Sequence, residues 1–137
     1  MADSVRKVDY FKALVPNRTG EGGNVLAALK EAGVNLLAFT GFPRGRQAQL
    51  DFVARDGAAF RRAARRAGLV IAGKKSCFLI QGNDRAGAVA GIAGKLAAAG
   101  IGIVALDAVA AGGGRYGAIL WVAAKDVGRA AKILGAS

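Results

Sequence analysis

Pro16-Asn17-Arg18-Thr19-Gly20 and Asn83-Asp84-Arg85-Ala86-Gly87 are two polar turns that each precede a helix-like segment. The first segment ends at Gly33 and the second at Gly100. Arg85 follows Arg18, and Gly100 follows Gly33, by the same 67 residues (85 − 18 and 100 − 33). Self-similarity at a fixed spacing indicates a duplicated structural unit. The sequence therefore predicts two copies of one α/β unit.

Working outward from these turns, each copy is predicted to contain strand, helix, strand, strand, helix and strand. Asn17 or Thr19 is expected to cap the first helix with a side-chain oxygen. The second copy lacks its last strand, which indicates a truncated copy or an edge filled by the N-terminal residues or by a partner chain. The predicted strands are 8–15, 36–40, 49–52, 69–72, 77–80, 101–109 and 118–123. Helices are expected after each of the two turns, at 60–67 and at 126–134, and turns at 41–45 and 112–115.

Two strands of the second copy, 101–109 and 118–122, are almost uninterrupted apolar runs. An antiparallel strand with one face in water alternates apolar and polar residues instead. We therefore expect both faces to be covered, one by helices and the other by a second sheet or subunit. This pattern favours a homo-oligomer, most simply a homodimer.

Composition limits the class of protein. The 137 residues are 53% hydrophobic, enough for a packed core. Twenty Lys and Arg against nine Asp and Glu give a net charge of +11, which favours anionic partners without specifying one. No export signal is recognised, and the longest uncharged apolar run, 96–106, is too short to span a bilayer. A cytoplasmic protein with no membrane partner is expected.

Residue types also exclude several chemistries. The chain has no histidine, so Cys77 has no histidine to activate it, and one cysteine forms neither an intrachain disulfide nor a cysteine cluster. Gly112-Gly113-Gly114-Arg115-Tyr116-Gly117 matches GxGxxG, but a strand follows it, which predicts a hairpin turn rather than a dinucleotide site. We expect no catalytic residue, no metal site and no cofactor.

The two turns, with Leu29 and Gly33-Val34-Asn35 in the first copy and Leu96 and Gly100-Ile101 in the second, make the chain resemble two ACT domains in tandem. Thr19 and Ala86 replace the proline usual at the third motif position. The resemblance implies an α+β fold of ferredoxin-like βαββαβ units in tandem, with antiparallel sheets and helices on one face. We expect the copies at 1–73 and 74–137.

The resemblance also implies a non-catalytic regulatory protein that binds a small molecule, typically an amino acid, and acts on another protein. A helix N-terminus attracts a carboxylate, and an arginine can add a two-pronged contact. Asp84 or an asparagine carbonyl can accept a hydrogen bond from an ammonium group. Gly102 stands where the first copy has Asn35. The expected ligand-binding residues are Asn17, Arg18, Thr19, Gly20 and Asn35 in the first copy, and Asp84, Arg85, Ala86 and Gly87 in the second.

Two other functions remain open. Arg61, Arg62, Arg65 and Arg66 share one helix face, which can grip phosphates in a basic nucleic-acid-binding module or can simply be solvated. A structural assembly module without a ligand is the second alternative. A screen of the twenty amino acids separates this module from a sensor, because a ligand that binds the native state raises its stability.

Overall fold

The computed structural model describes residues 3–137 and divides the chain into two compact units. The first unit is Asp9–Lys75. The second unit combines the described residues up to Val8 with Ser76–Ser137. The expected copies at 1–73 and 74–137 describe repeats of sequence, whereas the compact units place the N-terminal residues with the second half of the chain. Each unit is described separately.

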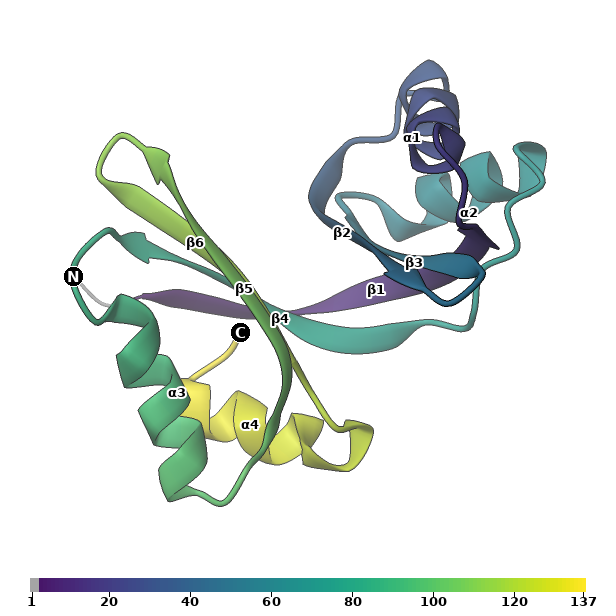
Figure 1. Cartoon of the computed structure of the whole chain (residues 1–137). Coiled ribbons are helices and arrows are strands. Elements are labelled where there is room, and N and C mark those ends of the chain that lie inside the picture. The colour runs from purple at the N-terminus through teal and green to yellow at the C-terminus, as the bar shows by residue number, and fades with distance from the viewer. Residues whose placement is uncertain (1–2) are drawn as a thin grey trace. The chain divides into compact units, whose positions relative to one another are not determined.

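The first unit is a three-stranded antiparallel sheet with two helices on one face (Figure 1). Its strands are hydrogen-bonded in the order β2-β3-β1. Phe60 of α2 stacks on Phe11 of β1 with ring centroids 5.1 Å apart and lies 5.0 Å from Phe52 of β3. Its elements are β1 (Ser4–Pro16, whose first residues belong to the second unit), α1 (Glu21–Glu31), β2 (Leu36–Arg44), β3 (Gln47–Ala54) and α2 (Gly57–Arg66).

The second unit repeats this arrangement with β4, α3, β5, β6 and α4. Its strands follow the order β5-β6-β4, and the start of β1 lies beside β4. Helices α3 and α4 cover one face of the sheet, with Leu96 and Leu134 buried against Phe78 and Leu120 (Figure 1). The elements are β4 (Lys75–Asn83), α3 (Ala88–Ala98), β5 (Ile103–Gly112), β6 (Arg115–Val122), a 3₁₀ turn η1 (Ala124–Asp126) and α4 (Val127–Leu134).

These features confirm the α+β class and the ferredoxin-like fold, in which helices pack on one face of an antiparallel sheet. The structure also shows which residues take the place of the missing last strand of the second copy. Lys7 N donates to Ser137 O at 3.1 Å, and Ser137 N donates to Val5 O at 3.0 Å. The N-terminal residues therefore occupy the sheet position beside β4, as one of the sequence alternatives predicted.

The hairpin interpretation of the GxGxxG stretch is confirmed. Strand β5 ends at Gly112 and β6 begins at Arg115, with Gly113 and Gly114 in the turn at φ 65° and 71°. The arginine face of α2 is solvent-exposed, while Phe60, Ala63 and Ala64 of the same helix are buried. Cys77 is fully buried in β4. No helix among residues 3–137 is long and apolar enough to span a membrane.

Three local predictions are wrong. The turn expected at 41–45 is mostly strand, because β2 continues to Arg44 and the chain reverses only at Gly45 and Arg46. The strand expected at 69–72 is reduced to one bridge between Ala13 and Ile71. No side chain caps α1, which begins after Gly20 at φ 92°.

The expectation that both faces of 101–109 are covered is also wrong within this chain. Strand β5 lies at the sheet edge, and all of its residues except the half-buried Leu106 are exposed. Val104 is 68% exposed and Val109 is 65% exposed. The prediction holds for 118–122, since β6 lies inside the sheet and its residues from Ala118 to Val122 are buried.

Candidate functional site

The two polar turns share one backbone device. Gly20 and Gly87 stand at the N-caps of α1 and α3 with φ of 92° and 78°, values that L-residues with a side chain rarely adopt. Neither helix has a side-chain cap. The first amide of each helix already donates within its own turn, Glu21 N to Arg18 O at 3.2 Å and Ala88 N to Arg85 O at 3.3 Å. The two amides that follow in each helix lack intrahelical acceptors. This requirement for a left-handed residue explains why a glycine recurs at the same place in both copies.

The first turn is open to solvent, and its side chains bond to nearby groups. Residues 17–20 are all exposed. Arg18 Nη2 lies 2.8 Å from Glu21 Oε1, and Asn17 Nδ2 donates to Gly45 O at 3.3 Å. Asn35 is exposed, and its carbonyl accepts from Arg55 N at 3.0 Å. The structure therefore leaves Arg18 paired with a carboxylate of its own helix.

A cavity of about 350 Å³ lies beside this turn, between α1 and the end of α2. Its walls are mostly apolar, with Glu21 and Asn24 as polar side chains. None of the five predicted residues of the first copy lines this cavity. Their part in ligand binding stays a prediction.

The second turn opens onto a pocket of about 260 Å³. Asp84, Arg85 and Gly87 line it, so the structure brings together three of the four residues predicted in this copy. Ala86 is exposed and lies outside the lining. The first turn of α3, Ala108–Ala110 of β5 and Tyr116 of β6 complete the walls.

Arg85 is bound by a carboxylate that lies far away in the sequence. Its Nη1 donates to Asp3 Oδ1 at 3.2 Å and its Nη2 to Asp3 Oδ2 at 3.3 Å. Nη1 also donates to the Asn83 carbonyl at 2.8 Å. The hydrogen bond from Arg85 lowers the pKa of Asp3 below its usual value, although partial burial of the carboxylate opposes this shift.

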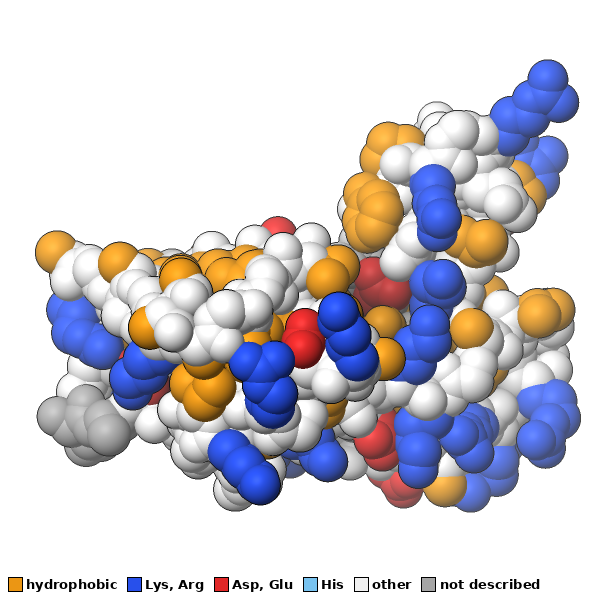
Figure 2. Space-filling view, turned by 90° about the horizontal axis from the view of Figure 1, so that it is seen from below, with side chains coloured by type: hydrophobic (Ala, Val, Ile, Leu, Met, Phe, Trp, Pro, Cys, Tyr) orange, Lys and Arg blue, Asp and Glu red, His pale blue; other side chains and the backbone are white. Residues whose placement is uncertain are grey.

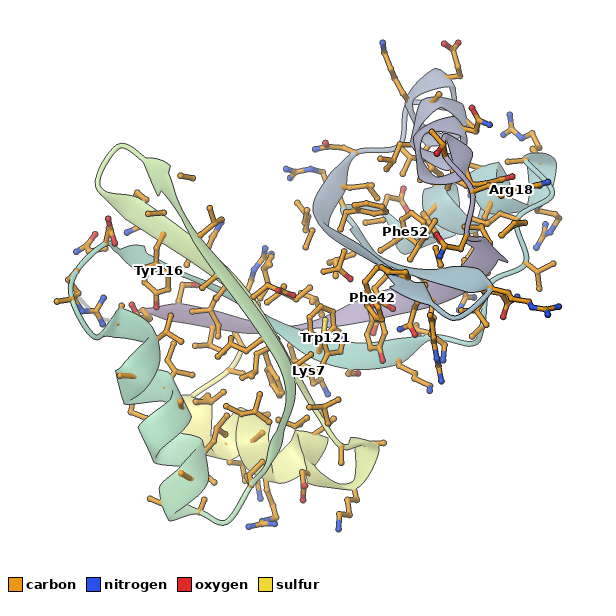
Figure 3. All side chains as sticks on the ribbon, in the orientation of Figure 1. Lys7, Arg18, Phe42, Phe52, Tyr116 and Trp121 are labelled. Carbon is orange, nitrogen blue, oxygen red and sulfur yellow. The ribbon has the colours of Figure 1, made fainter. Side chains whose placement is uncertain are left out.

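Tyr116 lies against this ion pair and is only 5% exposed. Figure 3 shows its ring directed from β6 toward the start of α3. Its hydroxyl is buried beside the Asp3 carboxylate and makes no well-aligned hydrogen bond among residues 3–137. Burial raises the pKa of Tyr116, and the nearby Asp3 carboxylate raises it further. The hydroxyl stays protonated and can donate a hydrogen bond at neutral pH.

Gly82 provides room for this arrangement. A Cβ at Gly82 would collide with Asp3 Oδ1 and would lie 2.8 Å from Tyr116 Cε1. Sequence reasoning missed Asp3, Gly82 and Tyr116. A glycine inside a strand often marks a close approach of other groups, so Gly82 carried a signal. Nothing in the sequence indicates the pairing of Asp3 with Arg85, because the two residues are 82 positions apart.

The pocket can hold a small carboxylate. Arg85 carries a planar pair of donors, which Asp3 occupies in this structure. The start of α3 adds backbone amides, and Asp84 adds an acceptor. A metal centre finds no support in residues 3–137, where no group of three or more His, Cys, Asp and Glu side chains could hold an ion.

The fold and this pocket define an α+β protein of two ferredoxin-like units with a polar turn at a small cavity. No known family model matches the chain, and no curated protein does. Solved structures share its fold. A protein from Bacteroides thetaiotaomicron is 17% identical with a TM-score of 0.81, the alignment covering 96% of this chain and 88% of that one.

Two further structures with a similar fold are regulatory parts of aspartate kinases. The regulatory subunit of aspartate kinase from Thermus thermophilus is 15% identical with a TM-score of 0.65, covering 98% of this chain and 96% of that one. A putative C-terminal regulatory domain of aspartate kinase from Porphyromonas gingivalis is 12% identical with a TM-score of 0.58, covering 98% and 95%. At these identities the likeness establishes the fold alone, and it is the fold that the ACT resemblance implies.

Proposed function

We propose that this chain is a non-catalytic regulatory protein that binds an amino acid at the second turn and signals to another protein. The pocket formed by Asp84, Arg85, Gly87, the start of α3 and Tyr116 carries this proposal. It combines donors for a carboxylate with an acceptor for an ammonium group, within a volume suited to a small metabolite. The first turn is a second candidate position for a ligand.

The likeness to the regulatory subunit and domain of aspartate kinase supports a regulatory role. The likeness spans nearly the whole chain and nearly the whole of those two structures. The kinase subunit from Thermus thermophilus is described in a ligand-free form. A ligand changes a protein's state only if it binds two states with different affinities, so the amino acid must favour one state of this chain.

The exposed edge of β5 supports a homodimer. Its ten residues carry only one charged side chain, Asp107, and neither lysine nor proline protects the edge. Unprotected edge strands pair readily with another strand. A second copy that adds its own β5 would hydrogen-bond the backbone edge that one copy leaves open.

A thermal-shift screen of the twenty amino acids at millimolar concentration tests the ligand. A ligand that binds the native state raises the melting temperature, by an amount that grows with its concentration. We expect at least one amino acid to do so. No shift with any of the twenty would leave the ligand-free assembly module as the better explanation.

Matched arginine variants then locate the site. Arg85→Gln is expected to remove the shift, because it deletes the donors for the carboxylate. Arg18→Gln changes the equivalent residue of the first turn and is expected to leave the shift intact. Loss of the shift in Arg18→Gln alone would move the site to the first turn. Circular dichroism of both variants checks that they fold.

A further inference from the structure

The contact between Asp3 and Arg85 has the chemistry of a bound ligand. Two carboxylate oxygens face two guanidinium nitrogens, which is how an arginine binds the carboxylate of a small molecule. Asp3 belongs to neither the turn nor α3; it directly precedes β1 and lies beside Gly82 of the neighbouring strand β4. A carboxylate from elsewhere in the chain therefore occupies the donors that the proposed ligand needs.

The contact is looser than a tightly held ion pair. Its distances of 3.2 and 3.3 Å exceed the roughly 2.7–2.9 Å of strong charge-assisted hydrogen bonds. The Arg85 side chain is 46% exposed, so water and solutes reach it. The Asp3 side chain is only 14% exposed, but Asp3 precedes β1, so displacing its carboxylate would not require the strand to unpair.

The hydroxyl of Tyr116, which lies against Asp3, is a further polar group at this place. Tyr116 lines the pocket, and its hydroxyl is buried beside the Asp3 carboxylate without a well-aligned hydrogen bond among residues 3–137. Buried polar groups are almost always hydrogen-bonded, since leaving one unpaired is costly. A carboxylate seated deeper in the pocket could accept from this hydroxyl.

We infer that Asp3 is an internal competitor, whose carboxylate holds the Arg85 position until the carboxylate of a small zwitterionic ligand displaces it. This inference rests on the proposed function and adds its regulation. In this exchange the carboxylate of the ligand replaces that of Asp3 at Arg85. It can also accept hydrogen bonds from the Tyr116 hydroxyl and from the amides of α3. Asp84 at the rim disfavours a phosphate dianion and suits a ligand that also carries an ammonium group.

The test compares wild type with Asp3→Asn, which removes the competing charge and keeps the side chain's size. Glu21→Gln is the matched control, because Glu21 pairs with Arg18 as Asp3 pairs with Arg85. Acetate and each of the twenty amino acids are titrated by calorimetry. We expect Asp3→Asn to bind the same amino acid about 1.5- to fivefold more tightly, the range for losing one exposed ionic competitor. Glu21→Gln should bind as wild type does.

The outcomes separate this inference from the proposed function. If wild type and Asp3→Asn bind one amino acid equally, or Asp3→Asn binds it more weakly, the competitor role is wrong while the ligand site stands. If no probe binds either protein, both ideas fail, because a released Arg85 would then attract no carboxylate. Binding of acetate as tightly as of the amino acid would overturn the zwitterionic ligand class.

Tyr116→Phe provides a second test. If Tyr116 has only a structural role, this substitution should not change the affinity for the ligand. Removing an unpaired buried hydroxyl should leave the melting temperature unchanged or higher. Removing a hydrogen bond to the ligand should weaken binding about fivefold in both the wild-type and the Asp3→Asn backgrounds. Unchanged affinity in both would overturn the assignment of Tyr116 to the site.

Discussion

Gly82 shows how one missing side chain shapes the second turn. It lies in β4 directly opposite Tyr116 of β6, and Asp3 approaches it from beside the strand. Any Cβ at this position must move the buried Tyr116 ring as well as the Asp3 carboxylate. The residue is therefore required for space, since its backbone has no left-handed φ.

Gly82→Ala should destabilise the protein by about 1–3 kcal/mol, the usual cost of overfilling a packed site. Gly117→Ala is the matched control, because a Cβ there meets only Ile80 O at an ordinary 3.8 Å. The control should range from no change to a gain of about 1 kcal/mol, as alanine is less costly to order than glycine. Denaturant unfolding measures both. Equal destabilisation would show that strand position, not space, sets the cost.

The Asp3–Arg85 pair predicts a specific pH dependence. Arg85 lowers the pKa of Asp3 from its usual 3.8 in the folded state. A lowered folded pKa means that the pair stabilises the protein above the unfolded pKa and loses this effect as pH falls through the folded value. As the pH falls from 5 to about 2, the melting temperature of wild type should therefore fall further than that of Asp3→Asn. Parallel curves for the two proteins would contradict the pair's contribution.

The site was predictable only where it is local. Arg85 and Gly87, which line the candidate pocket, stand in the repeated motif that predicted them. Asp3 and Tyr116 reach the same place through strand pairing that joins distant parts of the chain. No spacing in the sequence encodes that meeting, because it depends on which strand lies beside β4.

At the scale of elements, the α2 cap is the clearest case of local sequence determining structure. Asp56 Oδ1 accepts from Ala58 N at 3.0 Å and from Ala59 N at 3.1 Å. Asp56→Ala should cost about 1 kcal/mol, the typical value of an N-cap. Asp56→Asn keeps the acceptor oxygen and should cost far less. Thermal unfolding compares them; an equal loss in Asp56→Asn would assign the effect to charge at the helix start.

Two elements departed from their local signals for physical reasons. Gly41 and Pro43 predicted a turn, yet β2 runs through both. Strand β2 is the edge of its sheet in the first unit, where a proline's missing amide donor is tolerated. The run 69–72 has strand-forming residues, but only Ile71 bridges to Ala13. Local propensity predicts that a strand can form, whereas neighbours decide how far it extends.

At the scale of the whole molecule, basic side chains recur across the surface and acidic ones are few, as the face in Figure 2 shows. The net charge of +11 makes association of two copies electrostatically unfavourable over distance. A dimer must therefore rely on contacts that are apolar and backbone-mediated. Strand β5 offers both.

Val104→Lys should convert a dimer into a monomer, because it places a charge on the exposed β5 edge away from the pocket lining. Val70→Lys is the control, since Val70 is 83% exposed in the first unit. Analytical ultracentrifugation measures the mass of each protein. A Val104→Lys variant that stays dimeric would exclude the β5 edge as the interface.

The division of β1 between the two units has a consequence for the order in which the protein assembles on the ribosome. The first unit is one uninterrupted stretch, Asp9–Lys75, so its residues are all available early in synthesis. The start of β1 is made before that stretch, but its partners in β4 and at Ser137 follow it. Chains fold from the N-terminus as they emerge, and distant pairings form slowly. Asp3 is thus synthesised before the whole of the first unit, whereas Arg85, which it binds, is synthesised after that unit.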